Sequence, residues 1–520
     1  MIKKILLIDV EFDQNGGEGG QLQAQWTHHP LGLMYLSAYT REQLPDVEIK
    51  IFHTVTVPDA REHVKQLMAE FAPDMVGLRA LSLFQNQYAE ISEVVRAERP
   101  EAVIVGGGPY STASYDDILN KGLVDIVVLE EGEVTFVELI NRLGDGNGIP
   151  EDIDGTAVVS HGSVHLNKKR ALVEDLDTLP HPDYDAIDLE DYSGFSNHAF
   201  QSANECAFIY SSRGCPYRCY YCHEALIKTV RRRSPENVVS EMEAHYTERG
   251  IRNFVFVDDI FNVPKKIGKE ILRMVIERMP EASLNFPNGL RADQLDDEFL
   301  DLLEAAGTTH MALAVETASP RLQKVVGKNL KIEKTRGMIQ NASQRFITCA
   351  FFMIGFPTET KEEAMETITF AESLKHLVQP VLSIVRVYPG LPLYTALNPT
   401  EEQKRRIEQQ TSEALQPKLQ GDPSFYGDFF SDEEVPLKSD DIRELRWEWM
   451  RSVIHNPERV QNSQKVLERH FDDDDILEFY RNLYDKPGFS QRDLNKLLGT
   501  GRLSKATTHT ADAAVAATLS

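Results

Sequence analysis

Short apolar runs alternate with amphipathic stretches along the first 150 residues. Five runs have the length and composition of buried strands: Ile5–Val10, Ile49–His53, Val76–Leu81, Ala102–Gly107 and Asp125–Leu129. Between them, Ala60–Phe71 and Tyr88–Glu98 repeat apolar residues at the spacing of a helix face. Strands that alternate with helices form a parallel, doubly wound sheet. The pattern therefore predicts an α/β domain over residues 1–150.

Three loops at the carboxyl ends of these strands have unusual residues. Ligands of doubly wound sheets bind outside the carboxyl ends of the strands. The candidate ligand-binding residues there are Leu81, Ser82, Gly106, Gly107, Glu131 and Gly132. Glycine lets a ligand approach the backbone closely, but the glycines could equally serve only to make tight turns.

The alternation of strands and helices restarts after a linker over residues 151–205, in which Thr156–Leu166 is expected to form a hairpin. Six further strands are predicted: Ala207–Ser211, Asn253–Val257, Ser283–Phe286, His310–Val315, Ile347–Ile354 and Leu382–Val387. Six βα units in series predict a partial (β/α)6 TIM-like barrel over residues 206–397. Active sites of such barrels lie at the carboxyl ends of the strands.

The last part of the chain has a helical and charged pattern. Residues 398–505 are predicted to be helical, with helices over Thr400–Leu415 and Asp440–His455. Phe471–Asp475 (FDDDD) is expected to start another helix, and residues 506–520 are expected to be a disordered tail.

Charge and hydropathy restrict the function classes. The 520 residues carry a formal net charge of −26, which repels phosphate backbones and argues against nucleic acid as a partner. No apolar run reaches the roughly 18 residues of a membrane helix. The apolar start after two lysines could be a signal peptide, but it is short and acidic residues follow it. We therefore expect a first β-strand and a cytoplasmic protein.

Three of the five cysteines lie within eight residues, directly after the first strand of the second series. Cys215, Cys219 and Cys222 form a C-x3-C-x2-C motif. Thiolates are the usual ligands of iron–sulfur clusters, and three of them leave the fourth iron of a [4Fe–4S] cluster open to a small molecule. The alternative is a structural zinc site with His223 or a distant residue as the fourth ligand, although zinc sites favour paired C-x2-C units and no second pair is present.

With Tyr221 just before its last cysteine, this motif resembles that of the radical SAM superfamily. The resemblance implies that Cys215, Cys219 and Cys222 hold a catalytic [4Fe–4S] cluster. It also implies that the open iron binds S-adenosylmethionine (SAM), and that one electron splits SAM to give a 5′-deoxyadenosyl radical. A reductant such as flavodoxin or ferredoxin would supply the electron.

Polar or glycine-rich residues follow the other barrel strands. The residues that the resemblance places around SAM are Tyr221, Asp258, Asp259, Arg291, Glu316, Gly355 and Pro357. Either aspartate could accept a bond from the SAM amine, Arg291 could pair with its carboxylate, and Glu316 could bind the ribose hydroxyls. Gly355 would let the adenine approach the backbone. Each residue also has a competing interpretation. Glu316 could cap the helix that follows it, and Asp258 and Asp259 could be solvated loop carboxylates. Arg291 could form a surface ion pair.

Two other features have simpler interpretations. Cys349 falls in a strand and is expected to be a buried core thiol. Arg231–Arg233 is expected to be a solvated basic turn, with binding of a phosphate-bearing substrate as the alternative.

The N-terminal half resembles the cobalamin-binding domain that precedes the barrel in one branch of the superfamily. The resemblance rests on Pro30–Leu33, Pro73–Gly77, Val105–Gly107 and the segment from Asp125 to Glu133. It implies bound cobalamin in contact with the loops named above. Glu11 stands where many such domains have a cobalt-binding histidine, so no axial histidine is predicted. A sheet that has lost cobalamin is the alternative.

Together the two resemblances imply a cobalamin-dependent radical SAM methyltransferase. Such an enzyme methylates an unactivated carbon of a small-molecule, natural-product or lipid-like substrate. One alternative keeps both cofactors but catalyses cyclisation or rearrangement. Another is a non-catalytic, metal-stabilised binding protein.

Overall fold

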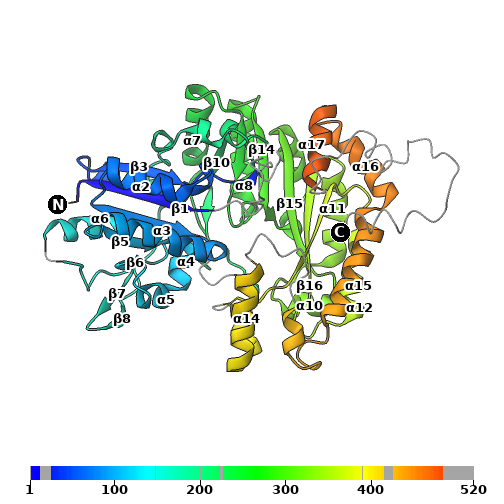
Figure 1. The fold of residues 1–520 in the computed structure, drawn as a ribbon. Coiled ribbons are helices and arrows are strands. Elements are labelled where there is room, and N and C mark those ends of the chain that lie inside the picture. Colours follow the sequence, from blue (N-terminus) through cyan, green and yellow to red (C-terminus); the bar gives the residue numbers. More distant parts are fainter. Residues whose placement is uncertain are drawn as a thin grey trace.

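Two β-sheets, one mostly and one entirely parallel, lie side by side with their surrounding helices in the computed structural model (Figure 1). The structure describes residues 2–11, 25–146, 148–197, 201–222, 227–388, 391–414 and 425–483. The predicted fold class, an α/β domain followed by a partial barrel and a helical region, is confirmed.

The N-terminal sheet has seven strands in the order β3-β1-β4-β5-β6-β7-β8. Its parallel strands are β1 (Lys4–Val10), β3 (Glu48–His53), β4 (Met75–Ala80), β5 (Val103–Gly107) and β6 (Ile126–Val128), close to the five predicted runs. Around it lie α1 (Leu31–Gln43), α2 (Ala60–Glu70), α3 (Gln85–Glu98), α4 (Gly108–Ala113), α5 (Tyr115–Asn120) and α6 (Glu133–Gly144). Leu6 and Ile8 of β1 pack into one core, and Leu7 packs into the other. This alternation explains why the strands are continuously apolar, since both faces are covered.

The predicted hairpin is present, but it belongs to the N-terminal sheet and not to a separate linker. Strands β7 (Thr156–Ser160) and β8 (Ser163–Leu166) form it, but β7 also pairs antiparallel with β6 and so extends the N-terminal sheet. The sheet therefore continues past residue 150, into the segment that was expected to be a linker.

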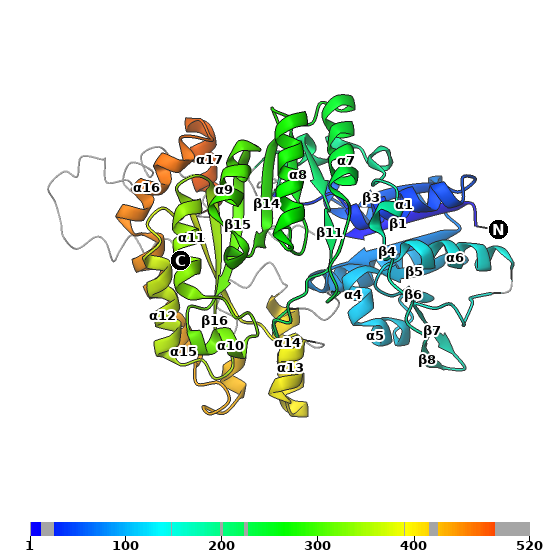
Figure 2. The same ribbon diagram turned by 180° about the vertical axis from the view of Figure 1, so that it is seen from behind.

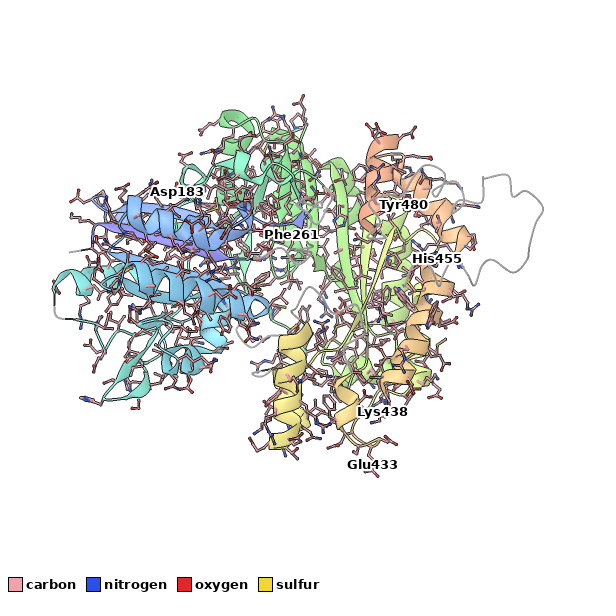
Figure 3. The ribbon with its side chains drawn as sticks, in the orientation of Figure 1. Asp183, Phe261, Glu433, Lys438, His455 and Tyr480 are labelled. Atoms are coloured by element: carbon pink, nitrogen blue, oxygen red, sulfur yellow. The ribbon has the colours of Figure 1, made fainter. Side chains whose placement is uncertain are left out.

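The rest of the linker packs against both domains. Strands β2 (Gln25–Trp26) and β9 (Phe195–Ser196) pair with each other. Asp183 lies against α1, where it accepts a hydrogen bond from Ser37 at 2.7 Å and pairs with Arg41 at 3.2 Å (Figure 3).

The second sheet is an open half-barrel of six parallel strands that follow one another in chain order. The strands are β10 (Cys206–Ile209), β13 (Asn253–Phe256), β14 (Ser283–Leu290), β15 (Thr308–Glu316), β16 (Ile347–Ile354) and β17 (Gln379–Ile384). Its helices are α7 (Pro235–Glu248), α8 (Lys265–Arg278), α9 (Asp297–Ala305), α10 (Pro320–Val325), α11 (Ile332–Ser343) and α12 (Lys361–Glu372). Strand β14 runs four residues further than predicted, through an irregular stretch of pairing in which Gly289 has a φ of +96°. The sixth strand begins and ends three residues earlier than predicted.

The last three of the C-terminal helices lie along the outer side of the half-barrel, and the first two lie below it, toward the N-terminal domain (Figure 2). In chain order these helices are α13 (Pro392–Leu397), α14 (Glu401–Ala414), α15 (Ser439–Trp449), α16 (Pro457–Leu467) and α17 (Asp473–Leu483), with a π-helical turn over Met450–Ile454. The buried Arg459 donates to the carbonyls of Leu377 and Val378, just before β17. The expected tail, 506–520, lies outside the described residues. Among the helices that the structure describes, none combines the length and apolar character needed to span a bilayer.

The linker residue Tyr184 forms a hydrogen bond with a backbone N–H group of β10. Its hydroxyl accepts from the Phe208 N–H at 2.8 Å, and both groups are buried. We expect Tyr184→Phe to lower the free energy of unfolding by about 1–3 kcal/mol, because it leaves a buried N–H without a partner. Urea denaturation measures the change. The control is Tyr246→Phe, which removes an exposed bond to Glu281; an equal loss in both variants would contradict the assignment.

Candidate radical SAM and cobalamin site

The three motif cysteines stand on one loop between the ribbon strands β11 (Ser212–Arg213) and β12 (Arg231–Arg232). The two strands pair antiparallel, which holds the ends of the loop together. Gly214 opens the loop with a φ of +90°, and a Cβ there would lie 2.4 Å from the carbonyl oxygen of Thr229. Glycine is therefore required where the chain enters the loop.

Cys219 and Cys222 come together across a tight turn, in which the Cys222 N–H donates to the Cys219 carbonyl at 3.0 Å. The Cys222 thiol also donates to the Cys219 sulfur. This bond, together with the nearby charges of Lys328 and Arg291, lowers the pKa of Cys219 to about 6. The same bond and burial raise the pKa of Cys222, and burial raises the pKa of Cys215. One sulfur of the motif is thus disposed toward the thiolate that a metal ligand requires.

A lysine that sequence reasoning missed lies beside the loop. The Nζ of Lys228 is buried and has no hydrogen-bond partner among the described residues. Its charge acts on Cys215, Cys222 and Asp259. A buried ammonium without a partner is costly, and a cluster bound by thiolates would supply the missing negative charge. The site therefore fits an anionic iron–sulfur group.

The zinc alternative needs four ligands around one ion. Within the described part of the chain, no group of three or more His, Cys, Asp and Glu side chains, the three motif cysteines included, is gathered closely enough to hold a single metal ion. His223, the suggested fourth ligand, lies outside the described residues.

Asp258 and Asp259 both bind the start of the cluster loop. The buried Asp258 carboxylate accepts from the Ser211 N–H at 3.1 Å and from the Ser212 hydroxyl at 2.5 Å. Asp259 accepts from the Gly214 N–H at 3.0 Å. Both carboxylates therefore hold the loop, and a contact of either with SAM stays a prediction.

Arg291 and Glu316 are already paired within the protein. Arg291 donates to both oxygens of Asp293, at 2.9 and 3.1 Å, and its guanidinium lies 3.7 Å from the Tyr217 ring centroid. Glu316, the last residue of β15, pairs with Lys328 at 2.7 Å, and both side chains are buried. If Arg291 binds the SAM carboxylate and Glu316 binds the ribose, as predicted, each would do so while also contacting its partner within the protein.

The end of β16 is covered by aromatic rings. Tyr221 and Phe356 pack with centroids 5.7 Å apart. Gly355 has a φ of +92°, and a Cβ there would come within 2.7 Å of the Phe425 ring. Adenine was expected to approach the backbone at Gly355, and in the structure Phe425 of the C-terminal region makes this close approach. Pro357 is half-buried next to these rings.

The sequence suggested no role for Glu359, which stands in the segment directly after β16, residues 355–360 (GFPTET). It is fully buried and accepts from the N–H groups of Gly355 and Phe356, at 2.5 and 2.9 Å. Its other oxygen has no partner among the described residues. Burial raises the pKa of Glu359 to about 8.

The candidate residues of the N-terminal domain lie at the carboxyl edge of its sheet. Leu81 is 43% exposed, Ser82 begins a short 3-10 turn, and the nearest atom to a Cβ on Gly107 would be 4.0 Å away. Gly106 has a different role, because a Cβ there would lie 2.7 Å from the Tyr88 hydroxyl. The edge at Leu81 and Gly107 is thus open enough to accept a ligand.

Glu131 is bound to the barrel. It accepts two hydrogen bonds from Arg231, at 2.7 and 2.8 Å, and one from Arg213 at 3.1 Å. Gly132 lies beside it at the start of α6, and a Cβ at this position would lie 3.5 Å from the Leu36 side chain. The expected solvated turn at Arg231–Arg233 is wrong, because Arg231 and Arg233 are buried in ion pairs, Arg231 with the distant Glu131 and Arg233 with Glu241 of α7.

Glu11, at the position of the missing axial histidine, is bound by a different histidine. It accepts from Thr27 at 3.3 Å and contacts Nε2 of the buried His53 at 3.0 Å. The other ring nitrogen of His53 lies 3.3 Å from the Tyr192 hydroxyl. Both nitrogens of His53 are therefore engaged within the protein.

Two family models match the larger part of the two domains described above. The model of the radical SAM superfamily matches residues 209–371, and that of the B12 binding domain matches residues 22–140. This chain is a B12-binding radical SAM protein of the methyltransferase type. Its cofactors are a [4Fe–4S] cluster, SAM and cobalamin.

Named relatives cover both domains of this radical SAM protein. An uncharacterized methyltransferase of Pyrococcus horikoshii is 27% identical over 373 residues, 71% of this chain and 78% of that protein. The cytidylyl-2-hydroxyethylphosphonate methyltransferase of Streptomyces wedmorensis is 27% identical, over 66% of this chain and 73% of its own length. The fold is similar to that of the cobalamin-dependent SAM radical enzyme OxsB. The TM-score is 0.64 at 14% identity, covering 96% of this chain and 79% of OxsB.

The buried carboxyl of Glu359 predicts a pH dependence of stability. In the folded protein its pKa is about 8, above the ordinary 4.5. The protonated carboxyl therefore stabilises the fold fully below about pH 4.5, and this stabilisation is lost as the pH rises through 8. We expect the free energy of unfolding of the wild type to fall by on the order of a few kcal/mol over this range, and that of Glu359→Gln not to show this fall. Urea unfolding from pH 5 to 9 measures both, with the exposed Glu362→Gln as the control. Equal slopes in wild type and Glu359→Gln would contradict the prediction.

Proposed function

We propose that this radical SAM protein methylates an unactivated carbon of a small-molecule substrate. The observation that carries the proposal is the contact between the cluster loop and the carboxyl edge of the N-terminal sheet. Arg213, two residues before the first cluster cysteine, donates to Glu131 at 3.1 Å and to Glu133 at 2.7 Å, at the carboxyl end of β6. Two cofactors that act on one carbon must face one cavity, and this contact brings their two expected surfaces together.

The overall reaction must balance. One SAM accepts an electron and gives methionine and an adenosyl radical, which takes a hydrogen atom from the substrate to form 5′-deoxyadenosine. A second SAM provides the methyl group and leaves as S-adenosylhomocysteine. Each methylation then consumes two SAM and two electrons. The cluster supplies electron transfer to SAM, and cobalamin supplies methyl transfer to a carbon radical.

The chain's own residues would hold and shield the reactants. Cys215, Cys219 and Cys222 would ligate the cluster, with Lys228 balancing its charge. Leu81 and Gly107 offer an open surface for the corrin ring. The aromatic cover over β16 would exclude water from the radical.

The proposal is tested by anaerobic reconstitution with iron, sulfide and hydroxocobalamin, followed by dithionite and SAM. We expect bound cobalamin by absorption and release of 5′-deoxyadenosine. Cys219→Ala should abolish 5′-deoxyadenosine formation, because the cluster loses a ligand. Cys349→Ala, which changes a buried cysteine outside the motif, should retain it. Turnover that survives in Cys219→Ala would overturn the site. A product heavier by one CH2 supports methylation, whereas a product without it supports cyclisation or rearrangement.

We further propose that an acidic electron carrier, a cytoplasmic flavodoxin or ferredoxin, docks on the outer side of the cluster loop. Helix α10 packs there, since the Tyr220 N–H donates to the Val326 carbonyl at 3.1 Å. Arg218, Lys324 and Lys331 are exposed and carry no ion pair among the described residues, and Val325 between them is 43% exposed. Unpaired cations over the cluster of a chain with net charge −26 favour an acidic partner.

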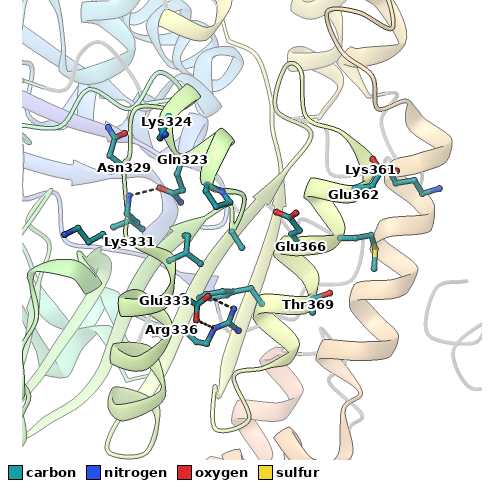
Figure 4. Close-up of a pocket in the computed structure, with 16 residues that line it drawn as sticks. Gln323, Lys324, Asn329, Lys331, Glu333, Arg336, Lys361, Glu362, Glu366 and Thr369 are labelled. Carbon is teal, nitrogen blue, oxygen red and sulfur yellow. Dashed lines mark hydrogen bonds and ion pairs between the residues drawn. The ribbon is translucent and has the colours of Figure 1, made fainter.

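A groove of about 1120 Å³ borders this docking face on the outside of the half-barrel. Lys324 and Lys331 line its side away from α12 (Figure 4). The groove lies outside the barrel, so it is distinct from the cavity proposed for the substrate.

Reversing one charge of the docking face should weaken reduction by the carrier alone. We expect Lys324→Glu to raise the flavodoxin concentration for half-maximal 5′-deoxyadenosine formation about tenfold at low salt. The dithionite-driven rate should be unchanged. Lys168→Glu, an exposed lysine of the N-terminal domain, is the control. An equal effect of both substitutions, or a loss with dithionite, would contradict the docking face.

A further inference from the structure

The ribbon that frames the cluster loop is bound to the N-terminal domain by two arginines. Arg213 of β11 bridges two carboxylates, with Nη1 on Glu131 and Nη2 on Glu133. Arg231 of β12 binds Glu131 with both of its terminal nitrogens. We call these four side chains the ribbon network.

The ribbon network is electrically balanced and shielded from water. It contains two arginines and two glutamates, whose side chains are between 6% and 19% exposed. The Tyr35 ring of α1 lies 5.2 Å from the Arg213 guanidinium. Although burial opposes it, the charges of Arg231 and Arg213 lower the pKa of Glu131, so the carboxylate stays ionised. Interactions of this kind are strong because little solvent screens them.

The linker is tied into the same network. The Val173 N–H donates to Glu131 at 3.0 Å, and its carbonyl accepts from Arg231 at 2.6 Å. The network thus joins the carboxyl end of β6, the linker and both ends of the cluster loop. Gly214 and Cys215 follow Arg213 directly, while Glu131 and Glu133 flank Gly132 of the predicted cobalamin face.

We propose that Arg213 is a positioning residue that sets the separation of the cluster from the cobalamin. This inference rests on the proposed function, since it requires both cofactors. The planar guanidinium reaches two carboxylates at once, whereas the single ammonium of a lysine has no such fork. Loosening this bridge should let the two cofactor surfaces move apart while each keeps its own ligands.

The test uses cofactor-loaded protein and no substrate. Cob(II)alamin and the reduced cluster are both paramagnetic, so the cluster speeds the spin relaxation of cob(II)alamin by an amount that falls steeply with their separation. In the wild type we expect faster relaxation when the cluster is reduced. Arg213→Lys should lose most of this enhancement while its iron and cobalamin contents stay at wild-type levels. Glu133→Gln, a milder change to the same bridge, should lose part of it.

Arg249→Lys is the matched control. It makes the same chemical change at an exposed pair with Asp185, between the linker and the barrel, and should keep the full enhancement. Unchanged relaxation in Arg213→Lys with both cofactors bound would overturn the positioning role and leave the proposed function standing.

Hydrogen–deuterium exchange gives a readout that does not need cobalamin. In cluster-loaded Arg213→Lys, exchange should rise on both sides of the bridge, in residues 128–136 and 170–176, and stay unchanged in α2. No rise there would also overturn the inference. Wild-type protein that takes up no cobalamin would instead overturn the proposed function, and the exchange result would then decide whether the bridge joins the domains.

Discussion

Buried charge at the junction of the two sheets is the constraint on which the site depends. The loop that carries the cysteines begins shortly after β10, and its described residues form no helix or strand between β11 and β12. It is fixed at its base by the β11–β12 ribbon, whose arginines reach the N-terminal domain and the loop after β13, while the next residue, Arg233, reaches helix α7. Because removing one partner would leave an opposite charge buried, these contacts hold the loop in one arrangement.

The same charges explain how an acidic protein can hold an anionic cofactor. The chain has an excess of acidic residues overall, yet cations gather around the cluster loop. Lys328 and Arg291 act on Cys219, and Lys228 acts on Cys215 and Cys222. Thiolates and a cluster are thereby favoured locally, although the net charge of the whole chain is strongly negative.

Local patterns in the sequence predicted most of the fold. Continuous apolar runs such as Ile5–Val10 became strands because both faces of each sheet are covered. The cysteine motif was predictable because its ligands lie close together in the chain. The partners of Arg213 were not, since Glu131 lies 82 residues away and no periodicity links them. Phe425, which packs on Gly355, was missed for the same reason. Lys228 lies close to the cysteines in the chain, but its sequence position does not show that its Nζ is buried. Arg231–Arg233 was misread because a run of arginines in a sequence says nothing of buried carboxylates that fold against it.

The proposed chemistry requires that three cysteines hold a cluster with one iron left open for SAM. Mössbauer spectroscopy of protein reconstituted with 57Fe resolves the individual irons. We expect a [4Fe–4S] spectrum in which one iron becomes distinct from the other three when SAM is added. Four irons that remain equivalent in the presence of SAM, or a protein that retains zinc and takes up no iron, would contradict it.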